Sequence, residues 1–305
     1  MLAVNADPSF PGTGIFSIVP AAVNEAPSTR IGAAPGAEAL VQRTVTNLAR
    51  WCVALTYTPR ARLPRPSTSA FGVIALAASA VVASMFFLDS AASNWARHLP
   101  PRFTEAFAQI TDFGLSGWFL YPLGFALLGL AAASSAALPR LAQGVLAALA
   151  VRCGFLFLAI ALPGLFVTIV KRLIGRARPY VVVGGNGYDD PFAYMPLAWR
   201  PDYASMPSGH ATTAAAAAIA IGVVWPRTRA VMWLYALTIM FSRVVVLAHH
   251  PSDVLAGALV GIIGALMVQR FFAARRLAFS TGLRPFSGPS SKRLKAVVRR
   301  IVVGR

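Results

Sequence analysis

The sequence is poor in charged residues and in cysteine. Only 12% of its 305 residues are charged, whereas 57% are hydrophobic, a balance that excludes an ordinary soluble domain. The two cysteines are Cys52, before the first long apolar segment, and Cys153, inside another. The membrane topology inferred below does not place both on the oxidising side, so we expect two free thiols and no structural disulfide.

Acidic residues are scarce as well. The chain has 10 aspartates and glutamates against 28 lysines and arginines, which gives a formal net charge of +18. Such a charge can mark a nucleic-acid-binding protein, but here the basic residues are concentrated before the first and after the last apolar segment. This distribution follows the positive-inside rule, so we predict both termini in the cytoplasm and no nucleic-acid partner.

Apolar residues occur in blocks that are long enough to cross a bilayer as helices, which takes about 20 residues. Six such blocks lie near residues 70–88, 115–137, 150–170, 208–225, 230–248 and 253–272. The sequence therefore predicts an all-α fold, a bundle of six transmembrane helices. We place this membrane domain at residues 67–272, between an N-terminal cytoplasmic segment, residues 1–66, and a basic cytoplasmic tail, residues 273–305.

The two flanking segments carry weaker signals. Residues 1–36 are rich in glycine, alanine, proline and serine without helical periodicity, which predicts disorder. No cleavable signal peptide is evident there. Residues 38–57 mix apolar and basic side chains, and either lie on the cytoplasmic membrane surface or form a solvated helix. We expect the basic tail to associate with anionic lipid headgroups.

Two connections between the predicted spans are longer than simple turns. In residues 102–111, large apolar side chains share one helical face, which predicts an interfacial helix that packs on the bundle without touching a substrate. Residues 180–206 form the longest connection, and loops of this length in compact proteins are usually functional or disordered. We expect any selectivity for a substrate headgroup to come from this loop and from the outer ends of the spans.

Three polar clusters interrupt the apolar pattern, at residues 171–179, 207–210 and 242–253. A charged side chain at membrane depth costs roughly 2.5 to 3.5 kcal/mol, so a functional site is the default explanation for such residues. Because successive spans alternate in direction, all three clusters fall on the side of the membrane opposite the termini. We therefore expect them to converge at the extracytoplasmic end of the bundle.

The basic residues on that side break the positive-inside rule, which an anion site explains better than an orientation signal. Lys171, Arg178 and Arg243 supply cationic donors, and the planar guanidinium of arginine matches two phosphate oxygens. Ser208 and Gly209 begin the fourth predicted helix, where free N–H groups and the positive end of the helix dipole favour an anion. These residues predict a phosphate-binding site.

Two histidines complete the residues needed for phosphoryl transfer. His249 and Asp253 are four residues apart at the start of the sixth predicted helix, so the carboxylate can reach the imidazole. This contact would fix the tautomer of a nucleophilic histidine and stabilise the charge that develops when it attacks phosphorus. His210 comes from a different helix and can act as general acid for the leaving oxygen.

Four other polar residues on this side of the membrane match no position needed for phosphoryl transfer. His250 is interpreted as a wall residue beside the proposed nucleophile, and His98 as a solvated loop residue. Arg172 and Arg176 either broaden the positive field over the site or lie among lipid headgroups.

The three clusters resemble the signature of the type 2 phosphatidic-acid phosphatase and vanadium haloperoxidase superfamily, K-x6-R-P, P-S-G-H and S-R-x5-H-x3-D. Every specified position matches, and the resemblance covers roughly residues 70–272. It implies a phosphohistidine intermediate on His249, held by Asp253, and protonation of the leaving group by His210. It also implies that the phosphoryl oxygens are bound by Lys171, Arg178, Ser208, Gly209 and Arg243.

The resemblance further implies that the phosphatase branch needs no metal. The loop carboxylates Asp189, Asp190 and Asp202 lack a metal-ligand pattern, so we predict no metal and no cofactor. The prediction is an integral membrane lipid phosphatase, which we place in a bacterial inner membrane with its active site facing the periplasm.

The substrate is predicted to be a phosphorylated lipid at headgroup depth. Phosphatidic acid, phosphatidylglycerol phosphate, undecaprenyl diphosphate and lipid A all fit, and the sequence does not choose among them. A lipid phosphotransferase, a vanadate-dependent haloperoxidase, and a catalytically silent transporter or scaffold on the same fold stay open as alternatives. The oligomeric state is not indicated.

Overall fold

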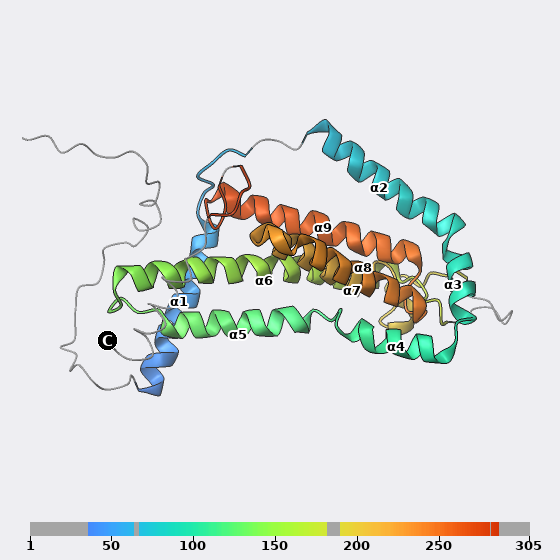
Figure 1. Cartoon of the computed structure of the whole chain (residues 1–305), viewed down its shortest axis with the longest axis horizontal. Helices are drawn as coiled ribbons and strands as arrows, with labels where there is room; N and C mark the ends of the chain where they lie inside the picture. Colours follow the sequence, from blue (N-terminus) through green and yellow to red (C-terminus); the bar gives the residue numbers. More distant parts are fainter. Residues whose placement is uncertain (1–35, 64–66, 182–189, 281, 287–305) are drawn as a thin grey trace, which may run out of the picture. The chain divides into compact units, whose positions relative to one another are not determined.

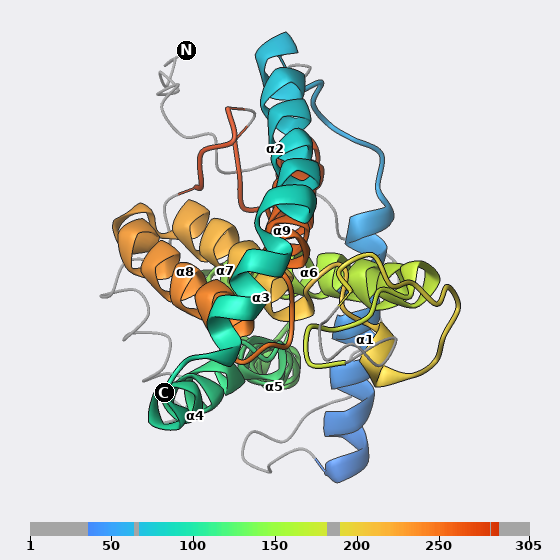
Figure 2. The same ribbon diagram turned by 90° about the vertical axis from the view of Figure 1, so that its right-hand side faces the viewer.

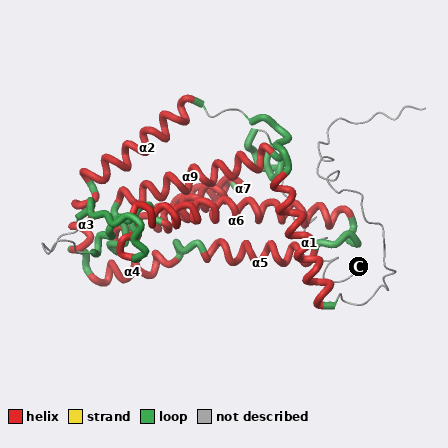
Figure 3. The backbone as a smooth tube through the Cα atoms, turned by 180° about the vertical axis from the view of Figure 1, so that it is seen from behind, coloured by secondary structure: helices red, strands yellow, loops and turns green. Residues whose placement is uncertain are grey.

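The computed structural model describes residues 36–63, 67–181, 190–280 and 282–286. Every regular element in these segments is a helix, and no strand occurs in them (Figures 1 and 3), which confirms the all-α prediction. The helices are α1 (Ala37–Thr56), α2 (Thr68–Phe87), α3 (Asp89–Arg97), α4 (Pro101–Asp112), α5 (Gly117–Ala133), α6 (Arg140–Ile174), α7 (Gly209–Val224), α8 (Arg229–Val245) and α9 (Pro251–Ala274), with 3-10 turns at Pro201–Tyr203 and Pro226–Thr228. The chain divides into two units, Met1–Ala39 and Leu40–Arg305, and the contacts described below lie within the second.

Each of the six predicted spans falls on a helix. Four stretches are long and apolar enough to cross a membrane: Thr68–Phe87, Pro101–Ala133, Arg140–Ile174 and Pro251–Ala274. The other two helices, α7 and α8, have 16 and 17 residues, slightly fewer than the about 20 that a perpendicular crossing takes. By length and composition, therefore, the described residues hold four candidate spans.

Several helix boundaries differ from the prediction. Helix α6 begins at Arg140, well before the predicted start near residue 150, because Pro139 precedes it and no proline interrupts the helix before Pro163. Helix α3 was not predicted, since its short, mostly polar sequence carries no long apolar repeat. Helices α1 and α4 do form where residues 38–57 and 102–111 predicted them.

Helix α7 is the centre of the bundle and packs against α6, α8 and α9 (Figure 2). Its sequence is rich in alanine, and the run Ala214–Ala218 is completely or almost completely buried. A helix that is apolar on all sides is expected to be enclosed by its neighbours. The small side chains allow those neighbours to approach closely, and α7 therefore holds the other helices in register.

The seam between α7 and α9 is formed by backbone against backbone. A Cβ atom at Gly257 would lie 2.3 Å from the Ser208 carbonyl oxygen, and one at Gly261 would lie 2.4 Å from that of Thr212. The Thr212 hydroxyl donates a hydrogen bond across the seam to the Gly257 carbonyl, at 3.0 Å. Small residues four positions apart are typical of helices that pack closely in membranes. This seam brings the N-termini of α7 and α9 together.

Helix α1 contacts the opposite end of the bundle. The Asn47 side-chain amide donates to the carbonyl oxygens of Ala131 and Ser134, at the end of α5. The Arg275 guanidinium, just after α9, donates to the carbonyl of Leu55 in α1. These contacts attach α1 to the helix ends that lie far from the N-termini of α7 and α9.

We predict that Gly257→Ala lowers the thermal stability of the detergent-solubilised protein. The added methyl group cannot fit against Ser208, and overpacking of this kind costs typically about 1–3 kcal/mol. Gly154→Ala is the matched control, because a Cβ atom at Gly154 meets nothing within 4 Å. Thermal unfolding followed by size-exclusion chromatography should show a lower midpoint for the first variant only. Equal midpoints for both would contradict the seam.

Candidate active site

The three polar clusters come together at the end of the bundle formed by the ends of α6 and α8 and the starts of α7 and α9, where Arg176 of the first cluster bonds to Asp253 of the third. The Ser208 N–H, which begins α7, donates to the Asp253 carbonyl of α9 at 2.9 Å. His249, between α8 and α9, is hydrogen-bonded to Ser205 in the loop before α7. The convergence predicted from alternating spans is therefore observed, although the clusters are far apart in sequence.

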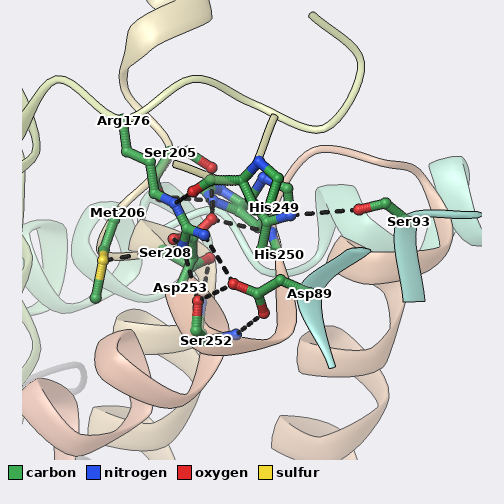
Figure 4. Close-up of polar contacts among 12 residues, drawn as sticks. Asp89, Ser93, Arg176, Ser205, Met206, Ser208, His249, His250, Ser252 and Asp253 are labelled. Carbon is green, nitrogen blue, oxygen red and sulfur yellow. Dashed lines mark hydrogen bonds and ion pairs between the residues drawn. The ribbon is translucent and has the colours of Figure 1, made fainter. Parts of the chain in front are cut away.

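The orientation of His249 is set by a backbone carbonyl. Its Nδ1 atom lies 2.7 Å from the Ser205 carbonyl oxygen (Figure 4). A carbonyl oxygen can only accept, so Nδ1 carries the proton and Nε2 keeps its lone pair. Asp253 lies close to the same ring, but its Oδ2 atom is 4.0 Å from Nδ1. The carboxylate can thus stabilise positive charge on the ring, while Ser205 selects the tautomer.

Asp253 is completely buried, and both of its carboxylate oxygens accept hydrogen bonds from other segments. The Ser205 hydroxyl donates to Oδ2 at 2.5 Å, and the His250 backbone N–H donates to the same atom at 2.9 Å. Arg176 Nη1 donates to Oδ1 at 2.6 Å. Figure 4 shows these groups around the carboxylate. Because both oxygens are engaged, the carboxylate cannot rotate without breaking contacts.

The surroundings of His249 favour its neutral form. Burial is the main cause that lowers its pKa well below the ordinary value, and the positive charges of Arg243 and Arg178 and the neighbouring His210 act in the same direction. The hydrogen bond to the Ser205 carbonyl acts in the opposite direction and is weaker. The ring is thus a neutral imidazole beside cations, which suits a nucleophile.

Two arginines close to the histidines each have a buried N–H donor that makes no hydrogen bond within the described residues. Arg243 is 7% exposed and donates through Nη1 to the Thr111 hydroxyl at 2.7 Å. Its Nε atom, and that of Arg178, are buried without a hydrogen-bond partner in the described part of the chain. An unsatisfied buried donor is costly, by about 1–3 kcal/mol. An anion that accepts from both would remove this cost, so the pair is suited to hold phosphate oxygens.

The start of α7 leaves room for an anion on one side. A Cβ atom at Gly209 would meet nothing within 4 Å, so the space beside this residue is open. The hydroxyl of Ser208 caps the helix by accepting from the Ala211 N–H, and its own N–H is bonded to Asp253. Of the two residues predicted to bind phosphate here, Gly209 faces open space, whereas Ser208 is engaged within the protein.

His210, the predicted proton donor, packs closely against the turn between α4 and α5. His210 is half-buried, and a Cβ atom at Gly114 would lie 2.9 Å from the His210 ring. The turn can approach this closely because position 114 is a glycine. Lys171 lies in the last turn of α6, also half-buried. The α4–α5 segment, predicted only as a packing element, thus contacts the site at Thr111 and Gly114.

Other polar residues near the site were missed or misinterpreted from the sequence. Arg176 was predicted either to broaden the positive field over the site or to lie among lipid headgroups, and the second alternative is wrong: its side chain is completely buried between Asp253 and Asp89. Asp89 and Ser205 were not singled out. Asp89 was detectable in principle, because a lone carboxylate follows directly after an apolar span. His250 is buried, as its interpretation as a wall residue requires.

No three His, Cys, Asp or Glu side chains in the described segments are grouped as metal ligands. The candidate site is therefore built from histidines, a carboxylate, a lysine and arginines. This set can bind an oxyanion and carry out nucleophilic attack with proton transfer.

Comparison with known proteins identifies relatives that match most of the chain. The PAP2 superfamily profile matches residues 152–277, which include all three motifs. The lipid A 1-phosphatase of Rhizobium johnstonii is 32% identical over 227 residues, 71% of this chain and 85% of that protein. The lipid A 1-phosphatase of Rhizobium etli is 31% identical over 227 residues, 71% of this chain and 90% of that protein.

Two solved structures are also similar. The LpxE structure from Aquifex aeolicus shares 23% identity and covers 57% of this chain and 89% of its own, with a TM-score of 0.40. The PAP2-type phosphatidylglycerolphosphate phosphatase from Bacillus subtilis shares 17% identity and covers 75% of this chain and 95% of its own, with a TM-score of 0.39. Given the profile match and the extent of the Rhizobium alignments, the chain belongs to the PAP2 superfamily.

Proposed function

We propose that this protein is an integral membrane lipid phosphatase that works through a phosphohistidine on His249. The observation that carries the proposal is the hydrogen bond from Nδ1 to the Ser205 carbonyl, which leaves Nε2 as a free nucleophile. Arg178 and Arg243, each with a buried Nε donor that is unpaired in the described chain, are close enough for their charges to act on this ring. A silent transporter or scaffold would have no use for a neutral histidine in this tautomer next to unsatisfied arginines.

The proposed reaction has two steps. In the first, Nε2 of His249 attacks phosphorus, the bond from phosphorus to the lipid oxygen breaks, and His210 gives a proton to that oxygen. Lys171, Arg178, Arg243 and the N-terminus of α7 stabilise the charge on the phosphoryl oxygens. In the second, His210 accepts a proton from water, which attacks the phosphohistidine and releases inorganic phosphate. The carboxylate of Asp253 stabilises the positively charged ring of His249 in both steps.

Among the candidate substrates we favour lipid A. Both Rhizobium relatives are named lipid A 1-phosphatases, and each aligns with 71% of this chain. On the proposed topology, the free donors of Arg178, which follows α6, and of Arg243, at the end of α8, lie at headgroup depth, where the phosphate of lipid A would be. Phosphatidic acid, phosphatidylglycerol phosphate and undecaprenyl diphosphate are then poorer substrates.

We propose a topology of six spans with the site on the extracytoplasmic side, in a bacterial inner membrane. The candidate spans, together with α7 and α8, make six crossings, and an even number returns both termini to one face. The positive-inside rule makes that face cytoplasmic. Helix α1 contacts the helix ends remote from the site, in agreement with a place on the cytoplasmic surface. Residues 1–66 and 273–305 then flank the membrane domain, residues 67–272, on that side.

The test is phosphate release by purified protein with chelator present and no added metal. The panel contains lipid A, phosphatidic acid, phosphatidylglycerol phosphate and undecaprenyl diphosphate. We predict release chiefly from lipid A, and its loss in His249→Ala, because no other group can form the covalent intermediate. His98→Ala is the matched control: this histidine is exposed outside the site and should be dispensable. Turnover by His249→Ala equal to that of the control would refute the mechanism.

The low pKa of His249 gives a second prediction. Since burial and neighbouring cations favour loss of the ring proton, His249 should stay neutral as the pH falls through the ordinary histidine pKa of about 6.5. Nitrogen-15 NMR of histidine-labelled protein at pH 6 should show a protonated Nδ1 and a bare Nε2, assigned by comparison with His249→Ala. A ring already half-protonated at pH 6.5 or above would contradict the site described here.

A further inference from the structure

The most extensive buried polar network in the described part of the chain is centred on Arg176 rather than on the phosphate-binding cations. Its side chain is 0% exposed, and so are those of both carboxylates that it contacts. Nη2 donates to Asp89 at 2.7 Å and Nη1 to Asp253 at 2.6 Å. Removing three charges from water is costly unless their partners are placed accurately. The arrangement of this network is therefore tightly constrained.

Helix α6 ends so that Arg176 can enter the interior. Gly175 follows α6 with a φ of 64°, a left-handed conformation that glycine adopts without strain. This turn reverses the chain directly before Arg176. The Nε atom of Arg176 then donates to the Pro191 carbonyl at 2.9 Å. The guanidinium is thus held by the backbone on one side and by carboxylates on the other.

Asp89 fixes the far end of the network. It lies where α2 ends and α3 begins, and it accepts from the Ser252 hydroxyl at 2.5 Å and from the Ser252 N–H at 3.0 Å. Ser252 is the residue before Asp253, and its hydroxyl also accepts from Arg176 Nη1 at 2.7 Å. Asp89 therefore holds both the guanidinium and the first turn of α9, as Figure 4 shows.

Arg176 also reaches the nucleophile through Ser205. The Ser205 N–H donates to the Arg176 carbonyl at 3.1 Å, and the Ser205 hydroxyl donates to Asp253. The carbonyl of the same serine accepts from His249. A continuous chain of hydrogen bonds therefore runs from Asp89 through Arg176 and Ser205 to the imidazole.

We propose that Arg176 and Asp89 are positioning residues for the reaction, which together set the orientation and the effective charge of Asp253. The inference rests on the proposed function. Two carboxylates share one guanidinium, so Arg176 does not fully neutralise Asp253. The remaining negative charge is available to stabilise the positive ring of His249 after attack. Neither residue touches the substrate.

The first variant is Asp89→Asn, which keeps the shape of the side chain and removes its charge. Arg176 would then pair with Asp253 alone and neutralise it more completely. We expect kcat to fall by about ten-fold or more, because the positive ring formed in the transition state loses electrostatic stabilisation, while KM changes by less than about two-fold. A purely structural role would instead lower the amount of folded protein and leave kcat per folded molecule unchanged. That second result would overturn the proposal.

Two further variants keep the test decisive. Glu105→Gln removes an exposed carboxylate on α4 and should alter neither constant. If Asp89→Asn does not fold, Ser252→Ala removes the hydroxyl that bridges Arg176 and Asp89 and leaves their direct ion pair in place. Asp253 would then supply the one oxygen acceptor left to Arg176 Nη1 among the described residues, and kcat should again fall with KM little changed. An unchanged kcat in a folded Ser252→Ala protein would overturn the proposal.

A second readout does not depend on catalysis. Nitrogen-15 NMR of His249 reports its hydrogen bond to Ser205, and Asp89→Asn should shift the Nδ1 resonance, whereas Glu105→Gln should not. If the wild type hydrolyses no lipid phosphate, the proposed function fails, but this shift still tests the connection from Asp89 to His249. An unshifted resonance in a folded Asp89→Asn protein would refute the connection itself.

Discussion

The buried carboxylate of Asp253 is the group on which the rest of the site depends. It accepts hydrogen bonds from Arg176, Ser205 and the His250 backbone, which belong to the loop after α6, the loop before α7 and the start of α9. A buried charge without such partners would be strongly destabilising. The same contacts that make the charge tolerable hold the two ends of the α6–α7 connection against the start of α9. Stability and the geometry of the site therefore have a common origin.

Polar groups at this end of the bundle fall into two classes. Those around Asp253 and Asp89 are paired with one another, which makes that part of the site rigid. By contrast, Arg178 and Arg243 each keep a buried Nε donor without a partner in the described segments. The first class supports the proposed nucleophile, and the second is available to the phosphate that we propose as its target. A site with this division can bind an anion without first breaking its internal ion pairs.

Much of this site could be predicted from the sequence. The three motifs identified His249, His210, Asp253 and the cationic residues, because polar residues in apolar segments stand out. The all-α fold and the positions of the helices followed from apolar runs. The partners of Asp253 could not be derived in the same way, since a sequence pattern shows spacing along the chain and not contacts across it. The glycines of the α7–α9 seam illustrate this, because their importance depends on the facing backbone.

The burial of Arg176 was not predicted, for a related physical reason. Next to Arg178 and Lys171 it was interpreted as part of the positive field over the site or as a headgroup contact, whereas the left-handed turn at Gly175 leads into a buried side chain. The contact between Asp253 and His249 was expected from their four-residue spacing. They are 4.0 Å apart, but the hydrogen bond of Nδ1 goes to the carbonyl of Ser205. Every residue has a backbone carbonyl, so the pattern of side chains does not indicate which carbonyl accepts a hydrogen bond. The bond between His249 and Ser205 was therefore not predictable.

The central claim is that Nε2 of His249 becomes covalently bonded to phosphorus. The most direct measurement is rapid mixing of the protein with a substrate carrying radioactive phosphate, followed by alkaline quenching, digestion and mapping of the labelled peptide. We predict one acid-labile phosphate on Nε2 of His249, formed faster than the steady-state turnover. Label on another residue, or steady turnover with no labelled protein at any time, would contradict it.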